Sequence, residues 1–340
     1  MKLRSGRVIG EAEQPFVIAE VNTSHFGDLN IARDMVLKAK EAGCDCVKFQ
    51  SWSEESLYSR SFYDDNPIAR RFVKKFSFAE AQLAEIASFS RSRGIEFSST
   101  PYSRKEVDFL VHGCAVPFVK VASMELNNYD YLDYIGRTGV PIVLSTGMGD
   151  IEEIRKAVKT IENTGNEEIC ILHCVSIYPP DISSMRLKNI VGLREEFPRH
   201  PIGFSDHSLG TEMATAAVAL GACVIEKHLT LDSKKIGMDN QMAAEPADMA
   251  RLVRHCHNVH LALGDSRRIV SQSELDQRQK MRRSIIAARD LTAGTRLTLE
   301  DLDFKRPGNG IPPDRARDIV GKTLLRDVEA DRLIGESDLS

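Results

Sequence analysis

The chain has 340 residues, of which 42% are hydrophobic and 28% charged, a balance typical of soluble globular proteins rather than disordered or membrane proteins. This length suits one large domain and one small one. The formal net charge of -4 gives no general attraction to nucleic acid or to an anionic membrane, so we expect neither as a partner, and local cations must hold any anionic substrate.

The first residues and the cysteines indicate the compartment. The opening MKLRSGRVIGEAEQPF lacks the apolar stretch of a signal peptide, and no apolar run approaches the ~20 residues that span a bilayer. Seven cysteines, an odd number without a CxxC pair, favour buried thiols over disulfides or a zinc site. We therefore expect a cytoplasmic protein.

Short β-rich runs alternate with amphipathic helical stretches. The runs, which we predict to be strands, occupy residues 16–22, 46–52, 96–102, 118–123, 141–147, 170–176, 202–207 and 224–230. Eight strands, each followed by a helix, predict an α/β fold of the (β/α)₈ TIM-barrel type. An open doubly wound sheet is the main alternative. It is disfavoured because no GxGxxG follows the first strand and because nearly every strand ends in polar groups.

Two segments differ from the barrel pattern. The longest connection, residues 53–78, is too long for a simple βα loop and too charged for core, so it is either a lid or a solvated insertion. After a barrel over 1–264, residues 265–281 predict a helical linker. Residues 282–340 predict a small β-rich module with short strands and a PGNG turn. This module is too small to be an independent enzyme, so we expect it to supply a binding surface.

Polar residues at the strand ends indicate a site. Side chains alternate along a strand, and the last inward positions of a barrel meet the substrate. This inward set comprises Glu20, Lys48, Gln50, Thr100, Lys120, Ser176, His207, Glu226 and His228. His173 and Lys227 lie at the alternate strand positions, which point outward, so we predict that both are structural.

Two histidines in this set predict a metal. His207 and His228 come from separate strand ends, with the carboxylates of Glu226 and Asp239 beside them. Such a group suits a divalent metal that keeps open positions for substrate and water. The alternative is a pair of structural histidines.

Two lysines predict a bound anion. Lys48 and Lys120 are flanked by apolar residues, and a lysine in such a strand is costly unless it reaches solvent or an anion. Hydroxyls at neighbouring strand ends would complete a phosphate cradle. A cradle, a metal and several carboxylates together suggest metal-assisted carbon–carbon or carbon–oxygen chemistry on a phosphorylated small molecule.

The motifs, taken in order, resemble those of the sialic acid synthase family, which condenses phosphoenolpyruvate with an N-acylated hexose to give a nonulosonic acid. They are FVIAEVN…GDLNIA, AGCDCVKFQ, SSTPY, VKVASMEL, LSTGMG, HCVSIYP, GFSDHSLG, VIEKHLTLD and KRPGNGI, and they cover nearly the whole chain. The C-terminal module resembles the family's antifreeze-like SAF domain. The resemblance implies a domain-swapped homodimer in which this module completes the partner's barrel.

The resemblance also implies individual roles. The metal, Mn²⁺ or Mg²⁺, would be bound by His207 and His228. Phosphoenolpyruvate would be held by Lys48, Thr100, Lys120, Ser123, Ser176 and Ser205. The amino sugar would be met by Glu20, Gln50, Tyr178, Asp239 and, from the other subunit, Arg306. Catalysis would rest on Glu20, Gln50, Glu226 and Asp239, with Glu226 positioning water.

The chain departs from the family pattern near the expected sugar end. VNTSHFGD replaces a VNHNGD-like stretch and places the histidine at His25, Asn240 of GMDN replaces a histidine, and Ser176 replaces an Asn common in N-acetylneuraminate producers. We therefore expect a 6-deoxy-2,4-diacetamido hexose rather than N-acetylmannosamine, because altered polar contacts change specificity. Neutral drift with an unchanged substrate is the alternative.

Three other functions stay open. One is a phosphoenolpyruvate-dependent synthase of shorter ulosonic acids, against which the KRPGNGI module argues. Another is a metal-dependent hydrolase, which would need further metal ligands. The third is a non-catalytic carbohydrate-binding protein, which would have no need for lysines in apolar strands.

Overall fold

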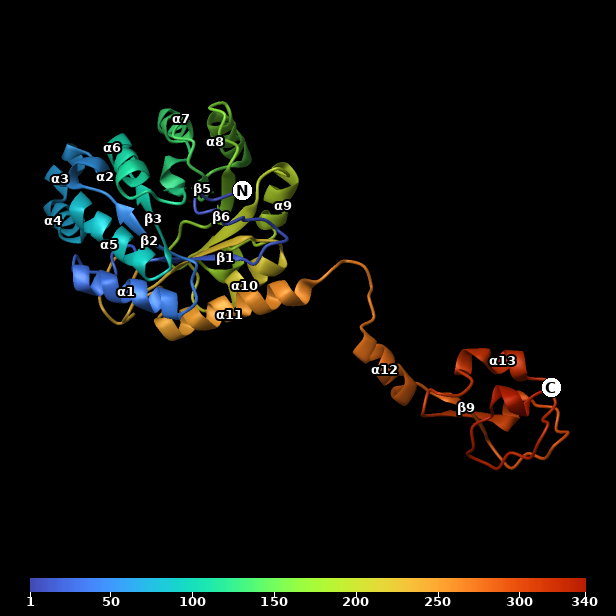
Figure 1. The fold of residues 1–340 in the computed structure, drawn as a ribbon. Helices are drawn as coiled ribbons and strands as arrows, with labels where there is room; N and C mark the ends of the chain where they lie inside the picture. The colour runs from blue at the N-terminus through green and yellow to red at the C-terminus, as the bar shows by residue number, and fades with distance from the viewer. The chain divides into compact units, whose positions relative to one another are not determined.

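The computed structural model describes all residues from Met1 to Ser340, which form two compact units, Met1–Gly264 and Asp265–Ser340. The first unit is the expected (β/α)₈ barrel (Figure 1). Its strands are β1 (Phe16–Glu20), β2 (Cys46–Ser51), β3 (Glu96–Pro101), β4 (Val119–Val121), β5 (Ile142–Ser145), β6 (Ile169–Cys174), β7 (Ile202–Asp206) and β8 (Val224–His228).

The strands run parallel in the order β3-β2-β1-β8-β7-β6-β5-β4, so the first and last strands pair with each other. β3 and β4 lie side by side, and the Ser98 hydroxyl donates to the Phe118 carbonyl across them at 2.9 Å. The predicted strands overrun the observed ones by one or two residues at their C-terminal ends. Apart from Lys48 and Glu226, which lie deeper in their strands, the predicted inward residues therefore stand at the last two strand positions or just beyond them, where barrel enzymes build their sites.

Helices surround the barrel, and each strand is followed by at least one of them before the next strand begins. They are α1 (Leu29–Glu41), α2 (Glu54–Leu57), α3 (Arg60–Asp65), α4 (Pro67–Phe76), α5 (Glu80–Ser92), α6 (Arg104–Asp108), α7 (Tyr129–Arg137), α8 (Ile151–Glu162), α9 (Asn189–Glu196), α10 (Glu212–Ala219) and α11 (Pro246–Leu263), with short turns at η1 (Phe109–Gly113), η2 (Ser123–Glu125) and η3 (Ile182–Ser184). Local chemistry sets their starts. Asp28, for example, caps α1 by accepting from the Asn30 and Ile31 N–H groups. None of the helices combines the length and apolarity that crossing a membrane requires.

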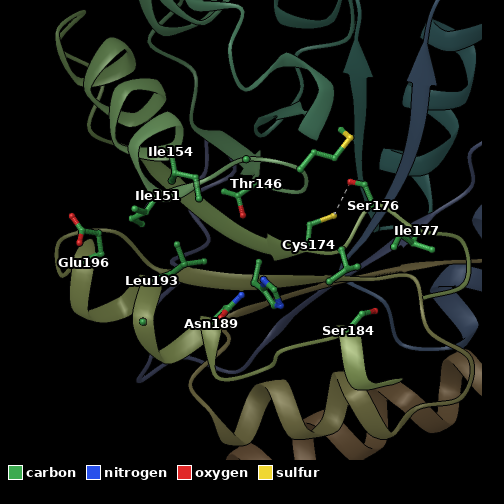
Figure 2. Close-up of a pocket in the computed structure, with 15 residues that line it drawn as sticks. Thr146, Ile151, Ile154, Cys174, Ser176, Ile177, Ser184, Asn189, Leu193 and Glu196 are labelled. Atoms are coloured by element: carbon green, nitrogen blue, oxygen red, sulfur yellow. Dashed lines mark hydrogen bonds between the residues drawn. The ribbon is translucent and has the colours of Figure 1, made fainter. Parts of the chain in front are cut away.

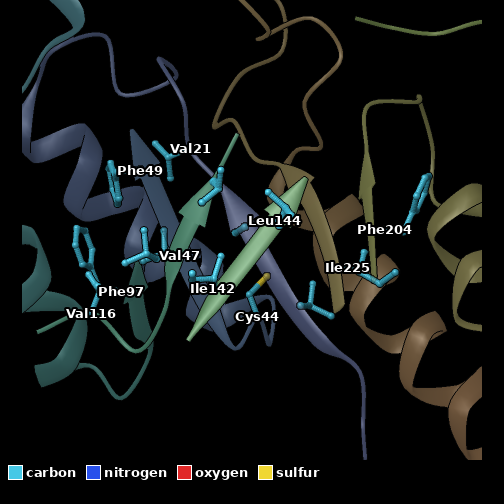
Figure 3. Packing of buried hydrophobic residues seen from close by; sticks show 14 of the residues in the cluster. Val21, Cys44, Val47, Phe49, Phe97, Val116, Ile142, Leu144, Phe204 and Ile225 are labelled. Carbon is cyan, nitrogen blue, oxygen red and sulfur yellow. The ribbon is translucent and has the colours of Figure 1, made fainter. Parts of the chain in front are cut away.

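The alternation of side chains divides the barrel core into two parts. Outward strand residues such as Val47, Phe49 and Ile225 pack in the main core with residues of the helices (Figure 3). Inward residues nearer the strand starts, such as Ile18 and Val224, form a separate apolar cluster. Two residues further along the same strands stand the buried Glu20 and Glu226. This apolar cluster therefore fills the barrel interior on the N-terminal side of the buried glutamates and closes that end of the barrel.

Residues 53–78, expected as a long loop, instead contain the three short helices α2, α3 and α4. They have a small core of their own, made by Trp52, Tyr63, Val73 and Phe76. The charged residues of this segment lie on its outer side, which is why its sequence looks too polar for packed structure.

The second unit holds α12 (Gln272–Met281), the antiparallel strands β9 (Ser284–Ala287) and β10 (Leu302–Lys305), and α13 (Ala316–Ile319). The turns η4 (Leu299–Asp301), η5 (Pro313–Arg315) and η6 (Glu336–Asp338) complete it. Its apolar core includes Ile285, Leu297 and Ile334. The Gly308 N–H donates to the Gln279 carbonyl at 2.7 Å, so α12 is attached to this β-rich unit.

Candidate active site

A cavity of about 360 Å³ opens at the C-terminal ends of the barrel strands. Every barrel residue predicted for the site lines it: Glu20, Lys48, Gln50, Thr100, Lys120, Ser123, Ser176, Tyr178, Ser205, His207, Glu226, His228 and Asp239. Arg306 belongs to the second unit, where it borders a groove with Lys305, Arg326 and Asp331. The strand-parity argument therefore identified residues that share one cavity.

Lys48 lies between two buried carboxylates. Its ammonium forms an ion pair with Glu20, lies 3.7 Å from Glu226 and donates to the Thr100 hydroxyl at 3.0 Å. Burial alone would lower the pKa of Lys48, but the two carboxylates outweigh burial and raise it. Lys48 is therefore a fixed positive charge at the cavity floor.

Lys120 has weaker anionic support. Its ammonium donates to the Ser145 hydroxyl at 2.7 Å and to the Val121 carbonyl at 3.0 Å, and Glu226 is 4.0 Å away. Burial lowers the pKa of Lys120 and Glu226 only partly opposes this. A buried ammonium with mainly neutral partners suits an anionic ligand. Ser145 was missed by the sequence analysis, although it is the last inward position of β5.

Glu226 is the second buried carboxylate beside Lys48. Glu226 accepts from the Ser205 hydroxyl at 3.1 Å, while its Oε2 is buried without a hydrogen-bond partner. Burial would raise the pKa of Glu226, but Lys120 and Lys48 outweigh burial and lower it. Glu226 is therefore an ionised carboxylate with an oxygen available to a proton donor in the cavity.

Two serines converge where the chain leaves β5. Ser123 accepts from the Gly147 N–H at 3.0 Å. A side chain at Gly147 would overlap the Ser176 hydroxyl and come within 2.9 Å of the Ser123 hydroxyl. Glycine at this position thus lets both hydroxyls face the cavity.

The two histidines lie together, with ring centroids 5.4 Å apart. His207 Nδ1 lies 2.8 Å from the Val175 carbonyl, so Nδ1 carries a proton. Burial would lower the pKa of His207, but its interaction with Cys174 outweighs burial and raises it. Burial, with the nearby His207, lowers the pKa of His228 well below its usual range, which keeps that ring neutral.

This donor set fits a metal held by few protein ligands. Neutral imidazole nitrogens are good ligands for divalent ions. The structure has no group of three or more His, Cys, Asp or Glu side chains arranged to hold a metal. Two imidazoles would therefore leave the remaining coordination positions to water and substrate.

A hydrogen-bonded chain of polar groups forms another wall of the cavity. Gln50 donates to Glu20 at 3.2 Å and accepts from the Tyr102 hydroxyl at 2.8 Å. Asn22 donates from its backbone to Glu20 at 2.9 Å and from its side chain to Asp239. Neither Asn22 nor Tyr102 was among the predicted site residues, although each lies two residues after an inward residue, Glu20 or Thr100, and so points to the same side.

Two of the three departures expected at the sugar end do not line the cavity. His25 is buried and stacks on Phe78 with centroids 4.1 Å apart, and burial lowers its pKa to about 4. Asn240 accepts from Ser24 and Thr230 and donates to two backbone carbonyls. Both side chains are structural, so the expectation that they alter the sugar end is wrong. Ser176 does line the cavity.

A second cavity of about 620 Å³ lies beside the first, between the ends of β5 and β6 and the helices α8 and α9 (Figure 2). It is largely apolar, with Ile151, Ile154 and Leu193 among its lining residues. His173 lies against it with its Nε2 2.7 Å from the Met185 carbonyl. The charged groups that could perform chemistry therefore gather in the smaller cavity.

The chain is similar in sequence to known proteins. A protein-family model described as the NeuB family matches residues 35–268, and a model of the SAF domain matches residues 282–340. An uncharacterized protein of Methanocaldococcus jannaschii is 38% identical over 99% of this chain and 98% of its own length. N,N'-diacetyllegionaminic acid synthase of Legionella pneumophila is 35% identical over 94% of this chain and 93% of its own.

The chain is also similar to a solved structure. N-acetylneuraminic acid (sialic acid) synthetase of Leptospira borgpetersenii, solved in complex with citrate, superimposes with a TM-score of 0.75 at 31% identity, over 82% of this chain and 95% of that one.

Proposed function

Because this chain belongs to the NeuB family of acid synthases and ends in a SAF domain, we propose that it condenses phosphoenolpyruvate with an N-acylated hexose to give a nonulosonic acid. The observation that carries the proposal is the meeting of Lys48, Lys120 and an ionised Glu226 with the paired histidine rings in one cavity. A hydrolase would not need two buried lysines, and a binding module would not need to keep them charged.

The cavity residues supply binding and proton handling for this reaction. The Lys48 and Lys120 ammonium groups would hold the phosphate and carboxylate of phosphoenolpyruvate, with hydroxyl support from Thr100, Ser123 and Ser145. C3 of phosphoenolpyruvate bonds to the sugar's aldehyde carbon, and water adds to C2. The C2–O bond then breaks to release phosphate. One water proton goes to the sugar oxygen and the other leaves with the phosphate, and Glu226 Oε2 is available to orient that water.

His207 and His228 would hold a divalent metal, Mn²⁺ or Mg²⁺, which when bound would polarise the aldehyde oxygen as a Lewis acid. The neutral ring of His228 and the position of His207 beside it, with ring centroids 5.4 Å apart, support this assignment.

The acceptor we propose is a 6-deoxy-2,4-diacetamido hexose, with N-acetylmannosamine as the second candidate. The cavity has apolar lining residues among its polar ones: Trp52, Leu57, Met124, Met148 and Met238. Such a lining suits the methyl groups of a deoxy carbon and of two acetamido groups. It also offers a poorer match to a fully hydroxylated chain.

We further propose a homodimer in which the SAF unit covers the partner's barrel. Exposed apolar side chains follow five of the barrel strands: Met124 after β4, Met148 after β5, Ile177 after β6, Leu209 after β7 and Ile236 after β8. Exposed apolar residues after so many strands at the same end of the barrel suit a surface that another part of the assembly covers. Arg306 is the SAF residue that would reach the sugar.

Phosphate release tests the function directly. Purified protein with Mn²⁺ and phosphoenolpyruvate is assayed with N-acetylmannosamine, 2,4-diacetamido-2,4,6-trideoxy hexoses, mannose or no sugar. We expect phosphate release only with an N-acylated hexose, most rapidly with a diacetamido sugar, and mass spectrometry should show the condensation product. Phosphate release without sugar would indicate a hydrolase. Sugar binding without turnover would indicate a binding protein.

Metal removal provides a second test. We expect EDTA to abolish turnover, Mn²⁺ to restore it, and His207→Ala to weaken Mn²⁺ binding measured by electron paramagnetic resonance at least tenfold. The exposed His112 is a matched control, and His112→Ala should bind Mn²⁺ as wild type does. Full turnover in EDTA would refute the metal assignment.

A further inference from the structure

Asn22 adopts a backbone conformation that is unusual for a residue with a side chain. It follows β1 at the cavity mouth with φ of 42°, in the left-handed region that costs non-glycine residues roughly 1–2 kcal/mol and that asparagine tolerates best. It is only 5% exposed. A glycine would make this turn without strain, so the turn itself does not call for the side chain that the chain carries here.

The asparagine amide is held in one orientation. Its NH₂ group donates to the Asp239 carboxylate, and its backbone N–H donates to Glu20 at 2.9 Å. Because the Asp239 oxygen accepts from the NH₂ group, the amide oxygen on the other side of the Asn22 amide faces away from Asp239.

That amide oxygen has no hydrogen-bond partner although it is buried. A buried acceptor left unpaired costs about 1–3 kcal/mol, and most such groups in folded proteins are paired. Asn22 also lines the cavity alongside Glu20, Gln50 and Asp239. We therefore expect a molecule that enters the cavity at this wall to supply the missing hydrogen-bond donor.

We propose that Asn22 is a specificity-determining residue whose Oδ1 accepts a hydrogen bond from the acceptor sugar. This inference rests on the proposed function, because the wall that Asn22 shares is the one assigned to the sugar. The donor is either the N–H of an acylamino group or a hydroxyl. Both present the same donor chemistry to a buried carbonyl oxygen.

The test replaces Asn22 by glycine, which keeps the left-handed backbone at lower cost and removes only the side chain. Initial rates are measured with the acceptor varied at saturating phosphoenolpyruvate, and then the reverse. We expect kcat/KM for the acceptor to fall about 3- to 30-fold, with KM for phosphoenolpyruvate and the Mn²⁺ affinity within twofold of wild type. Ala115→Gly is the matched control, since Ala115 is an exposed residue with φ of 50° in the turn before β4, and it should change neither constant.

The two donors are distinguished by sugar binding, because mannose is not expected to turn over. Dissociation constants for N-acetylmannosamine and for mannose are measured by calorimetry in wild type and Asn22→Gly. A rise confined to N-acetylmannosamine assigns the acylamino N–H, and an equal rise for both sugars assigns a hydroxyl. Unchanged acceptor kinetics in Asn22→Gly, or a parallel rise in KM for phosphoenolpyruvate, would overturn the inference while leaving the proposed function in place. A wild-type protein that condenses no sugar would overturn both.

Discussion

At the level of single residues, a buried polar side chain can stabilise the fold without facing the cavity. His25 is 2% exposed, stacks on Phe78, and accepts from the Gly27 N–H through Nδ1 at 3.0 Å. Burial lowers its pKa from 6.5 to about 4, so the folded protein holds a neutral imidazole. The unfolded chain takes up a proton here between about pH 6.5 and pH 4. The free energy of unfolding therefore falls as the pH falls through this window.

Replacing His25 by phenylalanine should remove this acid sensitivity while keeping the stack on Phe78. Between pH 7 and pH 5, we expect the free energy of unfolding to fall by about 2 kcal/mol more in wild type than in His25→Phe. Urea unfolding followed by fluorescence of Trp52, the single tryptophan, measures both proteins at each pH. Parallel losses would show that His25 does not titrate in this range.

Lys227 and Asp206 form a buried ion pair on the outward faces of β8 and β7. Their charged atoms are 2.8 Å apart at 1% and 0% side-chain exposure, and both residues also contact Ser208. The two residues are register partners in neighbouring strands, each next to a proposed metal-binding histidine. The alternation argument and the structure agree that Lys227 points away from the cavity.

Lys227→Met should destabilise the barrel by about 3–5 kcal/mol, because it leaves the Asp206 carboxylate buried without a partner. The double variant Lys227→Met/Asp206→Asn should recover part of this loss, as no charge is then left unpaired. Lys38→Met is the control, since Lys38 pairs with Glu41 on the exposed face of α1 and should cost less than about 1 kcal/mol. Urea unfolding measures all three, and a double variant no more stable than Lys227→Met would contradict the pairing.

Strand alternation predicted the cavity residues well because a strand fixes side-chain direction rigidly. Asn22, Tyr102, Ser145 and Cys174 also line the cavity but were not named as site residues. All four have the parity of inward positions, so alternation gave their direction and only their residue types left them unnoticed. Cys174 lines the cavity, but a cysteine in an apolar run carries no signal that separates a buried thiol from a site residue.

At the level of secondary structure, the insertion of α2, α3 and α4 is held against the turn after β1. Gly27 lies in this turn at φ of 76°, and a side chain there would overlap the Lys75 carbonyl oxygen at the end of α4. The close approach therefore requires glycine for space as well as for conformation.

Gly27→Ala should loosen α4 and expose it to protease. The helix carries exposed cleavage sites at Arg70, Arg71, Lys74 and Lys75, so limited trypsin digestion should cut there at least severalfold faster than in wild type. Gly139→Ala is the matched control, because Gly139 also has positive φ but nothing lies within 4 Å of the added carbon. Equal cleavage in both variants would mean that strain, rather than the Lys75 contact, governs the effect.

The order and number of strands were predictable from sequence, whereas these three helices were not. Eight apolar runs bounded by turn residues leave few alternatives to a barrel. Helices as short as α2 and α3 lack the repeated apolar stripe that marks longer ones. They are stabilised by packing around Trp52 and Tyr63, which sequence spacing does not reveal.

At the level of the whole molecule, the proposed domain swap makes a prediction about mixed subunits. In a hybrid of Arg306→Ala and His207→Ala chains, one mouth would combine an intact barrel with an intact SAF unit. Both parent proteins should be nearly inactive, and random mixing after subunit exchange should restore about a quarter of wild-type turnover.

A mixture of His207→Ala with His228→Ala is the control, since every barrel in it is defective, and it should stay inactive. Verified hybrids of the first pair without recovery would show that each SAF unit serves its own barrel or none.

The pairing of β1 with β8 has a consequence for how the protein acquires activity during folding. Glu20 and His228 are register partners across this seam, although 208 residues separate them in sequence. Closing a loop of that length costs about 5 kcal/mol of chain entropy, and contacts between such distant segments tend to form slowly. A half-folded chain would hold Glu20 on β1 and Lys48 on β2 apart from His228 on β8, because the pairing of β1 with β8 would not yet have formed. Catalytic competence would then arise in the last step of folding, when the ring closes.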